Sequence, residues 1–213
     1  MNIRAPLSQA LLAPVADYYS SKIAQFGSQP RGVDWNGADG QNLRFRQLCK
    51  VFDENSAEVW VADIGCGYGA LIDYLTATAR PYRYVGVDIS PAMIDAARRL
   101  HGDNSNVELV IGTLPAAPVD YAVASGIFNV KLGADSAEWE HAILATLDGL
   151  QKSSIKGFSF NCLTSWSDED RKRPDLFYAD PARLFDHCKR HYSRNVALLH
   201  DYGLYEFTLV IRK

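Results

Sequence analysis

The chain has 213 residues, of which 47% are hydrophobic and 22% charged, a composition typical of a soluble globular protein. No window approaches the ~18 consecutive apolar residues of a membrane span. Pro14 and Asp17 interrupt the short apolar patch near the N-terminus, so we do not interpret it as a signal peptide. The formal net charge of −3 gives no broad attraction to nucleic acid or anionic lipid.

The first 55 residues lie outside the regular alternation that follows them. Residues 8–27 have a helical pattern, residues 28–40 are a loop rich in glycine and turn formers, and residues 41–54 are helical again. We therefore expect one domain over residues 1–213, in which a helical cap, residues 1–55, leads into a core of residues 56–213.

From residue 58 onward, short apolar runs alternate with amphipathic ones. The pattern predicts strands at 58–65, 82–89, 106–112, 119–126 and 155–164, and helices at 70–80, 90–102, 136–153 and 180–192. The second helix opens with Ser90 and a proline, and the third has Ser136 as its N-cap candidate. Residues 195–213 predict two strands around the turn at Tyr202 and Gly203.

Strands that alternate with helices favour right-handed crossovers and a mostly parallel sheet. The last two strands have no helix between them, so they must pair antiparallel. The chain is therefore expected to be an α/β protein with a three-layer, Rossmann-like fold. Its seven-stranded sheet is mostly parallel, with the last strand antiparallel, and the helical cap is added at the N-terminus.

The stretch "VADIGCGYGA", residues 61–70, has three glycines at alternate positions after a predicted strand. Glycines there let the backbone turn sharply and approach a ligand closely. The spacing differs from the G-x-G-x-x-G dinucleotide fingerprint, and no Gly-Lys-Ser/Thr follows as in a phosphate loop. A carboxylate at Asp63 would repel a pyrophosphate but not an amine or sulfonium. A structural turn without a ligand is the alternative.

The second predicted strand ends at Asp88, where a carboxylate can accept hydrogen bonds from both hydroxyls of a ribose. "VADIGCGYG" followed about twenty residues later by "YVGVDIS" resembles motifs I and II of the class I S-adenosylmethionine-dependent methyltransferases. The antiparallel last strand is also similar to that family's sheet. The resemblance covers roughly residues 58–213 and implies S-adenosyl-L-methionine as the cofactor of a methyltransferase.

The resemblance also implies roles for particular residues. Asp63 and the turn residues would hold the methionine end, Asp88 the ribose, and Ile89 the adenine. Ser125, Gly126 and Ile127 would line the site of methyl transfer, and Tyr19 of the cap would reach the cofactor carboxylate. The turn residues are Gly65, Cys66, Gly67, Tyr68 and Gly69.

One position departs from the family pattern. Many members have an acidic residue just after the third strand that contacts the adenine amine. Here Thr113 and Leu114 occupy that region. The Thr113 hydroxyl, or the backbone beside it, is left as the expected partner of the ring edge.

Methyl transfer needs alignment, and a base only where the nucleophile must lose a proton. Phe128 and Asn129 are expected to face the substrate, although Phe128 is equally compatible with the core and Asn129 with a turn cap. His200 is a candidate base, but a half-exposed histidine in a tight turn is favoured. Trp35 and Tyr178 are candidate pocket walls, and ordinary packing is as plausible for Trp35.

His187 and His191, four residues apart around Cys188, resemble half a metal site, but charged neighbours favour a solvated helix face and no metal is expected. The acids and bases of residues 168–173 cancel, which indicates a solvated loop. The four cysteines, Cys49, Cys66, Cys162 and Cys188, form no C-x-x-C pair, and reduced thiols in the cytoplasm are expected.

We predict a cytoplasmic methyltransferase, monomeric or homodimeric, that acts on a small molecule without nucleic-acid or membrane partners. Within enzymes, the alternative is methylation of a protein or RNA. A non-catalytic cofactor-binding scaffold and a nicotinamide-dependent oxidoreductase are the alternatives from other classes, and the glycine spacing argues against the oxidoreductase. The sequence leaves open whether oxygen, nitrogen or sulfur accepts the methyl group.

Overall fold

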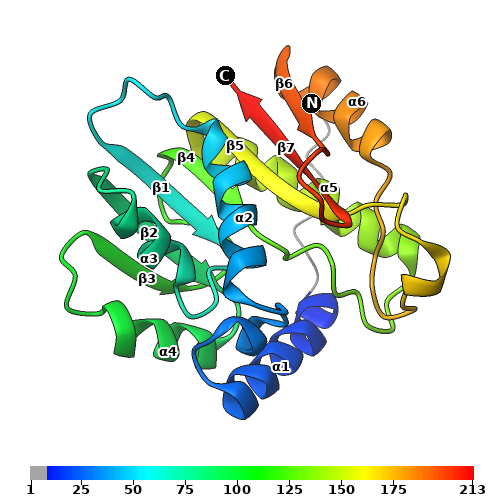
Figure 1. Cartoon of the computed structure of the whole chain (residues 1–213), viewed down its shortest axis with the longest axis horizontal. Coiled ribbons are helices and arrows are strands. Elements are labelled where there is room, and N and C mark those ends of the chain that lie inside the picture. The colour runs from blue at the N-terminus through cyan, green and yellow to red at the C-terminus, as the bar shows by residue number, and fades with distance from the viewer. Residues whose placement is uncertain (1–8) are drawn as a thin grey trace.

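A seven-stranded sheet runs through the structure, a computed structural model that describes residues 9–213 (Figure 1). Its strand order is β3-β2-β1-β4-β5-β7-β6. The first five strands are parallel, and β7 is antiparallel to both of its neighbours. This confirms the predicted sheet. The strands are β1 (Val59–Ile64), β2 (Tyr82–Asp88), β3 (Val107–Ile111), β4 (Val119–Ala124), β5 (Ser154–Leu163), β6 (Asn195–Leu199) and β7 (Glu206–Arg212).

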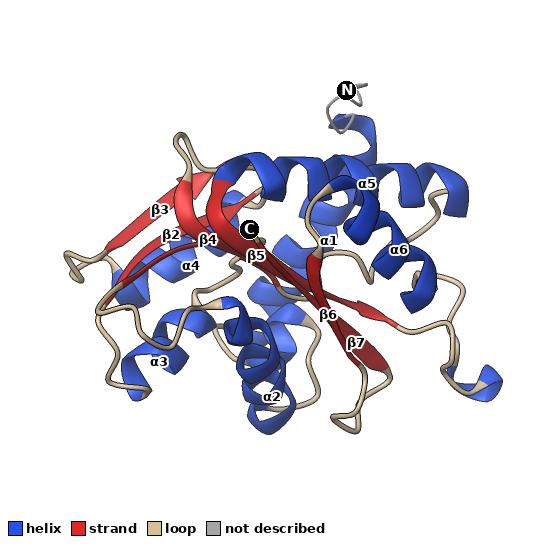
Figure 2. Cartoon of the chain, turned by 90° about the horizontal axis from the view of Figure 1, so that it is seen from above, coloured by secondary structure: helices blue, strands red, loops and turns tan. Residues whose placement is uncertain are grey.

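Helices cover both faces of the sheet, which makes three layers (Figure 2). Helices α2 and α3 pack on one face, and α5 and α6 pack on the other. The α-helices are α1 (Gln9–Phe26), α2 (Ala38–Leu48), α3 (Ala70–Ala77), α4 (Pro91–His101), α5 (Ser136–Ser153) and α6 (Pro181–His191). Three short 3-10 turns are at Pro30–Val33, Cys49–Val51 and Glu169–Arg171. The last of these lies in the loop predicted to be solvated, and its three residues are exposed.

The central strands are apolar along nearly their whole length because both of their faces are covered. Within β1, five of six residues are buried, and the same holds for β4. On the α5 side, Phe158 and Phe160 of β5 are fully buried, and Phe160 makes an edge-to-face contact with Phe128. Burial on both faces fixes the register of these strands and therefore the positions of their ends.

Side chains that precede the first turn cap three of the helices. Ser90 accepts a hydrogen bond from the backbone N–H of Met93, as its place before a proline predicted. Asp180 caps α6 in the same way. For α5 the prediction of Ser136 was wrong: Asp135 is the N-cap, and its carboxylate accepts from two backbone N–H groups. A carboxylate also interacts favourably with the positive end of the helix dipole.

The N-terminal segment lies across the carboxyl ends of the strands. Helix α1 packs against α4 and the turn Pro30–Val33, and it contains Pro14. Helix α2 packs on β5 and β7. It begins at Ala38, so its first turn, residues 38–40, lies inside the stretch predicted as loop. No helix within residues 9–213 has the length and apolar character to cross a bilayer.

Candidate functional site

The glycine turn after β1 approaches the neighbouring strand ends closely. Gly65 has a φ of +73°, and a Cβ at this position would overlap the side chain of Ile127 beyond β4. The N–H groups of Gly65 and Cys66 both donate to the carbonyl oxygen of Val87 on β2. Glycine is required here because other residues avoid this backbone region and lack the space. The turn therefore brings the ends of β1, β2 and β4 together.

Asp88 ends β2, and it is buried beside this turn. The backbone N–H of Gly67 donates to one carboxylate oxygen at 2.9 Å, and that of Ser90 donates to the other at 2.8 Å. Burial raises the pKa of the Asp88 carboxyl, and these backbone hydrogen bonds oppose the rise. Each oxygen has further acceptor capacity, so the carboxylate can still accept hydrogen bonds from a ligand.

A cavity of about 130 Å³, here called the first cavity, lies over the carboxyl ends of β1 to β4. Its walls are mostly apolar and come from the strand ends, from α1, from the segment between α1 and α2, and from α5. The lining residues are Leu11, Leu12, Val15, Tyr19, Val33, Trp35, Ile64, Gly65, Gly67, Asp88, Ile89, Met93, Gly112, Thr113, Ser125, Gly126, Ile127, Phe128, Trp139, Ala142, Ile143 and Thr146. This is the place where open α/β sheets bind ligands, at the switch in strand order between β1 and β4.

The Ser125 hydroxyl lines the first cavity and is buried without a hydrogen-bond partner among the described residues. Buried hydroxyls are normally paired, because a lost hydrogen bond to water costs free energy. An unpaired hydroxyl that faces a cavity is therefore available to a ligand.

Asp63 lies behind the first cavity and does not line it. It is buried on β1, and the Tyr84 hydroxyl donates to its carboxylate at 2.8 Å. Burial raises the pKa of the Asp63 carboxyl to about 7, against the effect of the Tyr84 hydrogen bond. Gly86 on β2 leaves the room that the Tyr84 ring and the Cys66 thiol occupy. The sequence analysis missed Tyr84. On β2 it lies two residues before Gly86, which is opposite Asp63, so Tyr84 and Asp63 are on the same face of the sheet.

A second cavity, of about 620 Å³, lies between the N-terminal segment, the end of β4 and the loops after β5 and β6. It is more polar than the first. Its lining residues are Tyr19, Val33, Asp34, Trp35, Asn36, Gly37, Ala38, Asp39, Gly40, Arg44, Gly126, Asn129, Val130, Leu163, Arg173, Leu176, Leu204 and Glu206. A volume of this size is within the range of small-molecule sites, which span roughly 300–1,000 Å³.

Four residues line both cavities, and we call them the constriction: Tyr19, Val33, Trp35 and Gly126. Gly126 has a φ of +75°, and a Cβ there would overlap the Trp35 ring. The indole therefore lies directly against the backbone at the end of β4. Burial raises the pKa of the Tyr19 phenol well above its usual range, so its hydroxyl stays protonated.

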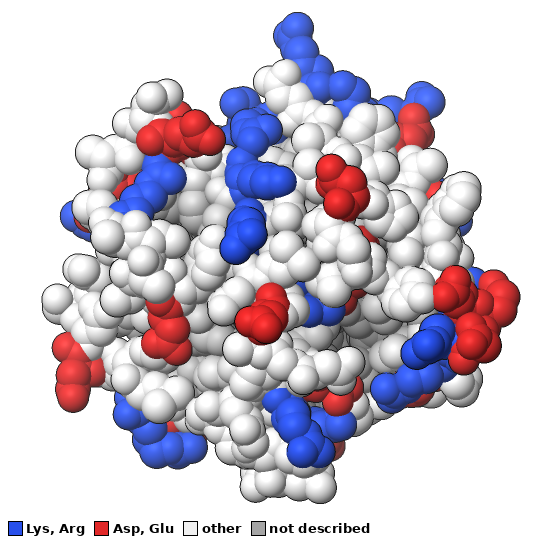
Figure 3. All heavy atoms as spheres, viewed as in Figure 1, with Lys and Arg blue, Asp and Glu red and all other residues white. Residues whose placement is uncertain are grey.

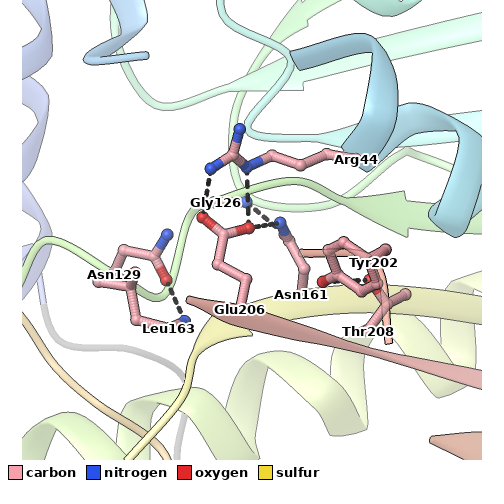
Figure 4. Close-up of polar contacts among 8 residues, drawn as sticks. All are labelled: Arg44, Gly126, Asn129, Asn161, Leu163, Tyr202, Glu206 and Thr208. Atoms are coloured by element: carbon pink, nitrogen blue, oxygen red, sulfur yellow. Dashed lines mark hydrogen bonds and ion pairs between the residues drawn. The ribbon is translucent and has the colours of Figure 1, made fainter. Parts of the chain in front are cut away.

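A group of buried polar side chains adjoins the constriction, and the sequence analysis missed it (Figure 4). Glu206 of β7 forms a bidentate ion pair with Arg44 of α2, with distances of 2.8 and 2.7 Å. Asn161 of β5 donates to Glu206 at 2.7 Å and accepts from the Gly126 N–H at 2.7 Å. The one sequence signal for these residues was an amide and a carboxylate in otherwise apolar strands.

The predicted cofactor residues divide into two sets. Those that line the first cavity are Tyr19, Gly65, Gly67, Asp88, Ile89, Thr113 and Ser125. The others, Asp63, Cys66, Tyr68, Gly69 and Leu114, do not line it. The Tyr68 hydroxyl donates to Gln41 of α2, and Leu114 packs over Gly149 of α5. Gly69 is the residue before α3, where it supplies a positive φ.

The predicted substrate and catalytic residues also divide. Trp35 and Asn129 line the second cavity, and the Asn129 amide oxygen accepts from the Leu163 N–H at 3.0 Å. Phe128 packs in the core and faces the first cavity instead. Tyr178 lines neither cavity, because its hydroxyl accepts from the backbone N–H of Arg173. His200 is exposed with its ring against Phe207, so the structure does not bring it to the site.

Neither the charge on the face in Figure 3 nor the metal-ligating side chains of residues 9–213 indicate a further binding site. On the face in Figure 3, basic and acidic side chains are interspersed, apart from a short row of basic ones over α2. The rings of His187 and His191 lie 4.4 Å apart on α6. Across residues 9–213, no group of three or more His, Cys, Asp or Glu side chains is arranged to hold a metal ion.

Comparisons with known proteins agree with this geometry. The family described as "Methyltransferase domain" matches residues 62–150. Rv1506c of Mycobacterium tuberculosis (strain ATCC 25618 / H37Rv), provisionally named a methyltransferase, is 54% identical over 153 residues. That match covers 72% of this chain and 92% of the relative.

Solved structures share the fold at low sequence identity. The DhpI–SAH complex has a TM-score of 0.64 at 15% identity and covers 97% of this chain and 98% of its own. A SAM-dependent methyltransferase from Aquifex aeolicus has a TM-score of 0.60 at 16% identity, and the coverages are 90% and 97%. The Rossmann-like fold is thereby confirmed, and so is the predicted family: the chain belongs to the methyltransferases.

Proposed function

We propose that this methyltransferase acts on a small-molecule acceptor that binds in the second cavity. The observation that carries the proposal is that two cavities adjoin. One lies over the strand ends, the other is polar, and the four residues of the constriction line both. The second cavity has walls on the N-terminal segment and on the loops after β5 and β6. A volume of about 620 Å³ is sufficient for a small molecule.

The first cavity is proposed to hold S-adenosylmethionine, and three features support the fit. The Asp88 carboxylate keeps free acceptor capacity for the ribose hydroxyls, and the Ser125 hydroxyl has no partner within the described chain. Gly65 and Gly67 of the turn line the cavity, and as glycines they present backbone to it and no side chain. Ile89 and Thr113, both in the cavity wall, are proposed to border the adenine.

Asp63 is proposed to act on the methionine end from behind the glycine turn. Its carboxylate is buried and has Tyr84 as its hydrogen-bond donor. An ammonium group nearby would favour the charged form of Asp63 and lower its pKa. The remaining turn residues, Cys66, Tyr68 and Gly69, are proposed to shape the turn and to make no contact through their side chains.

The chemistry that the bound cofactor supplies is an electrophilic methyl group on a sulfonium. The chain's own residues hold the acceptor in line with that group and exclude water. Trp35 and Gly126 border the path between the cavities, and the protonated Tyr19 hydroxyl is available as a hydrogen-bond donor there. Asn129, proposed as a substrate contact, has an amide nitrogen left to bind the acceptor because its oxygen is held by Leu163.

The test combines binding with turnover. Calorimetry should detect micromolar binding of S-adenosylhomocysteine, and incubation with methyl-labelled cofactor should transfer label into the small-molecule fraction of a cell extract. Transfer only into the protein fraction or only into RNA would overturn the small-molecule proposal in favour of that alternative. Cofactor binding without transfer to any fraction would favour a non-catalytic scaffold.

Three further proposals concern the whole chain. Residues 1–55 are proposed to be the helical cap of a single domain, because the described part of this segment, residues 9–55, borders both cavities and has no separate core. The protein is proposed to work in the cytoplasm without nucleic-acid partners. It is proposed to be a monomer or a homodimer.

A further inference from the structure

The inference begins at Glu206, a buried carboxylate at the start of β7. Its side chain is 1% exposed, and both of its oxygens are hydrogen bonded. Arg44 contacts both oxygens, and Asn161 contacts one of them. The close-up in Figure 4 shows these three side chains meeting between α2 and the sheet. One carboxylate thus joins the N-terminal segment to two strands.

The first arm from Glu206 leads to the end of β4. Asn161 donates from Nδ2 to Glu206 and accepts at Oδ1 from the Gly126 N–H. The reverse amide orientation would place an NH₂ group against the N–H and an oxygen against the carboxylate, so the network assigns this one. The Gly126 backbone, one wall of the constriction, is therefore tied to Glu206.

The second arm leads to the opposite wall. The Arg44 guanidinium carbon lies 3.8 Å from the centre of the Trp35 ring, the geometry of a cation–π contact. Trp35 in turn lies directly against Gly126. Both arms of one carboxylate therefore end on the two surfaces that face each other at the constriction.

A buried ion pair is weak evidence for stability, because desolvation offsets its Coulomb energy. What this pair supplies is fixed geometry, since a bidentate arginine leaves little freedom to rotate or shift. We propose that Glu206 is a positioning residue for methyl transfer, which sets the spacing between Trp35 and Gly126 through Arg44 and Asn161. The inference rests on the proposed function in one respect only: it takes the constriction as the place where the methyl group passes from the cofactor to the acceptor.

The test uses two cofactor analogues and needs no acceptor. S-adenosylhomocysteine lacks the transferred group, whereas sinefungin has an amine-bearing carbon in place of the methyl sulfonium. If the constriction surrounds that amine, Glu206→Gln should weaken the binding of sinefungin about tenfold more than the binding of S-adenosylhomocysteine. A factor of this size is expected when one contact between a cation and an aromatic ring is disrupted. A general loss of structure would weaken both analogues equally. Because no acceptor is needed, failure of the small-molecule proposal leaves this measurement valid.

Two further variants keep the test decisive. Arg44→Lys keeps the charge but loses the bidentate fork and the planar stack, so it should shift the ratio of the two dissociation constants in the same direction by a smaller factor. Thr208→Val is the matched control. Thr208 is buried on β7 opposite Asn161 and bonds Tyr202 at 3.0 Å, but it has no arm to the constriction (Figure 4).

The control should lower the melting temperature and leave the ratio unchanged. An unchanged ratio in folded Glu206→Gln, or in folded Arg44→Lys if the first variant does not fold, would overturn the proposal. An equal shift in Thr208→Val would also overturn it, because the effect would then belong to the packing of β7. A selective shift in the Glu206 and Arg44 variants supports it.

Discussion

The two cavities use their carboxylates in opposite ways. In the second cavity, Glu206 is paired with Arg44 and Asp34 is paired with Lys22, at 2.7 Å in each case. Beside the first cavity, Asp88 and Asp63 form no salt bridge within residues 9–213, and their partners are backbone N–H groups and a tyrosine. Cationic side chains therefore pair Glu206 and Asp34 of the second cavity, whereas we propose that Asp88 and Asp63 act on the hydroxyls and the positive charge of a ligand.

The same contrast separates rigidity from binding. The ion pair of Arg44 with Glu206 crosses from the N-terminal segment to the sheet and holds these two walls of the second cavity together. The first cavity is built on strand ends, whose positions the buried sheet already fixes. We therefore propose that charge serves geometry in the second cavity and ligand recognition in the first.

The largest expected effect is on Asp88. Asp88→Ala should weaken S-adenosylhomocysteine about 100-fold or more, because it removes charge-assisted hydrogen bonds worth roughly 1.5–3 kcal/mol each. It also leaves the N–H groups of Gly67 and Ser90 without their acceptors. Isothermal titration calorimetry measures the change, and Asp95→Ala on the exposed side of α4 is the control. An affinity within twofold of the wild type would refute the ribose assignment.

The next effect concerns stability and pH. The pKa of Asp63 is raised to about 7 in the fold, so the folded state holds a proton that the unfolded chain releases from about pH 4 upward. The contribution of Asp63 to wild-type stability should therefore fall as pH rises from about 4 to about 7. Asp63→Asn escapes this loss, and its stability relative to wild type should grow by about 2 kcal/mol between pH 5 and pH 8.

Urea unfolding at several pH values tests this expectation. Glu206→Gln, where the carboxylate already has an arginine partner, is the matched variant from the second cavity. It should destabilise the protein, since it leaves the Arg44 guanidinium buried without its counter-charge. If Asp63→Asn were also destabilising at pH 8, the proposed difference between the two cavities would be wrong.

A smaller effect tests the polar cavity alone. Arg173 lines it, half-exposed, and pairs with Asp175. Arg173→Ala should raise the KM for the acceptor about tenfold, the loss of one charge-assisted hydrogen bond, and leave cofactor affinity within twofold. Arg183→Ala is the control, because this exposed arginine on α6 is also paired with a carboxylate, that of Glu140. A change in cofactor affinity would show that the two sites are less separate than proposed.

The difference between the cavities also explains what sequence could predict. The first cavity is lined largely by the segment from Ile64 to Phe128. Strand periodicity and glycine spacing located Gly65 and Asp88, and the family resemblance added Ser125. The mostly parallel sheet followed from the same alternation, and its antiparallel last strand from the absence of a helix before it. Each of these features is visible in a short stretch of sequence. The parallel sheet then brings the stretches together, because the carboxyl ends of its strands meet at one edge.

The second cavity was less accessible to prediction because its parts are far apart in the chain. Arg44 and Glu206 are separated by 162 residues, and nothing in either local pattern names the other. Aromatic and histidine side chains near strand ends drew the predictions for Phe128, Tyr178 and His200. Phe128 packs in the core, Tyr178 lines neither cavity, and His200 is exposed. Packing across elements decided these positions, and a single sequence does not encode it locally.

The smallest expected effect has opposite signs for stability and binding. The Ser125 hydroxyl is buried without a partner in the described part of the chain, so removing it should cost the fold nothing and stabilise it by up to about 1 kcal/mol. If the hydroxyl binds the cofactor, Ser125→Ala should also weaken S-adenosylhomocysteine about threefold to tenfold, the value of one hydrogen bond.

Thermal unfolding and calorimetry on the same sample separate these two effects. Ser159→Ala is a matched control, since the Ser159 hydroxyl on β5 donates to the Leu48 carbonyl at 2.8 Å, away from both cavities. That variant should lose stability and keep its affinity. If Ser125→Ala behaved like Ser159→Ala, its hydroxyl would have a structural partner, and the first cavity would lose one of the groups assigned to its ligand.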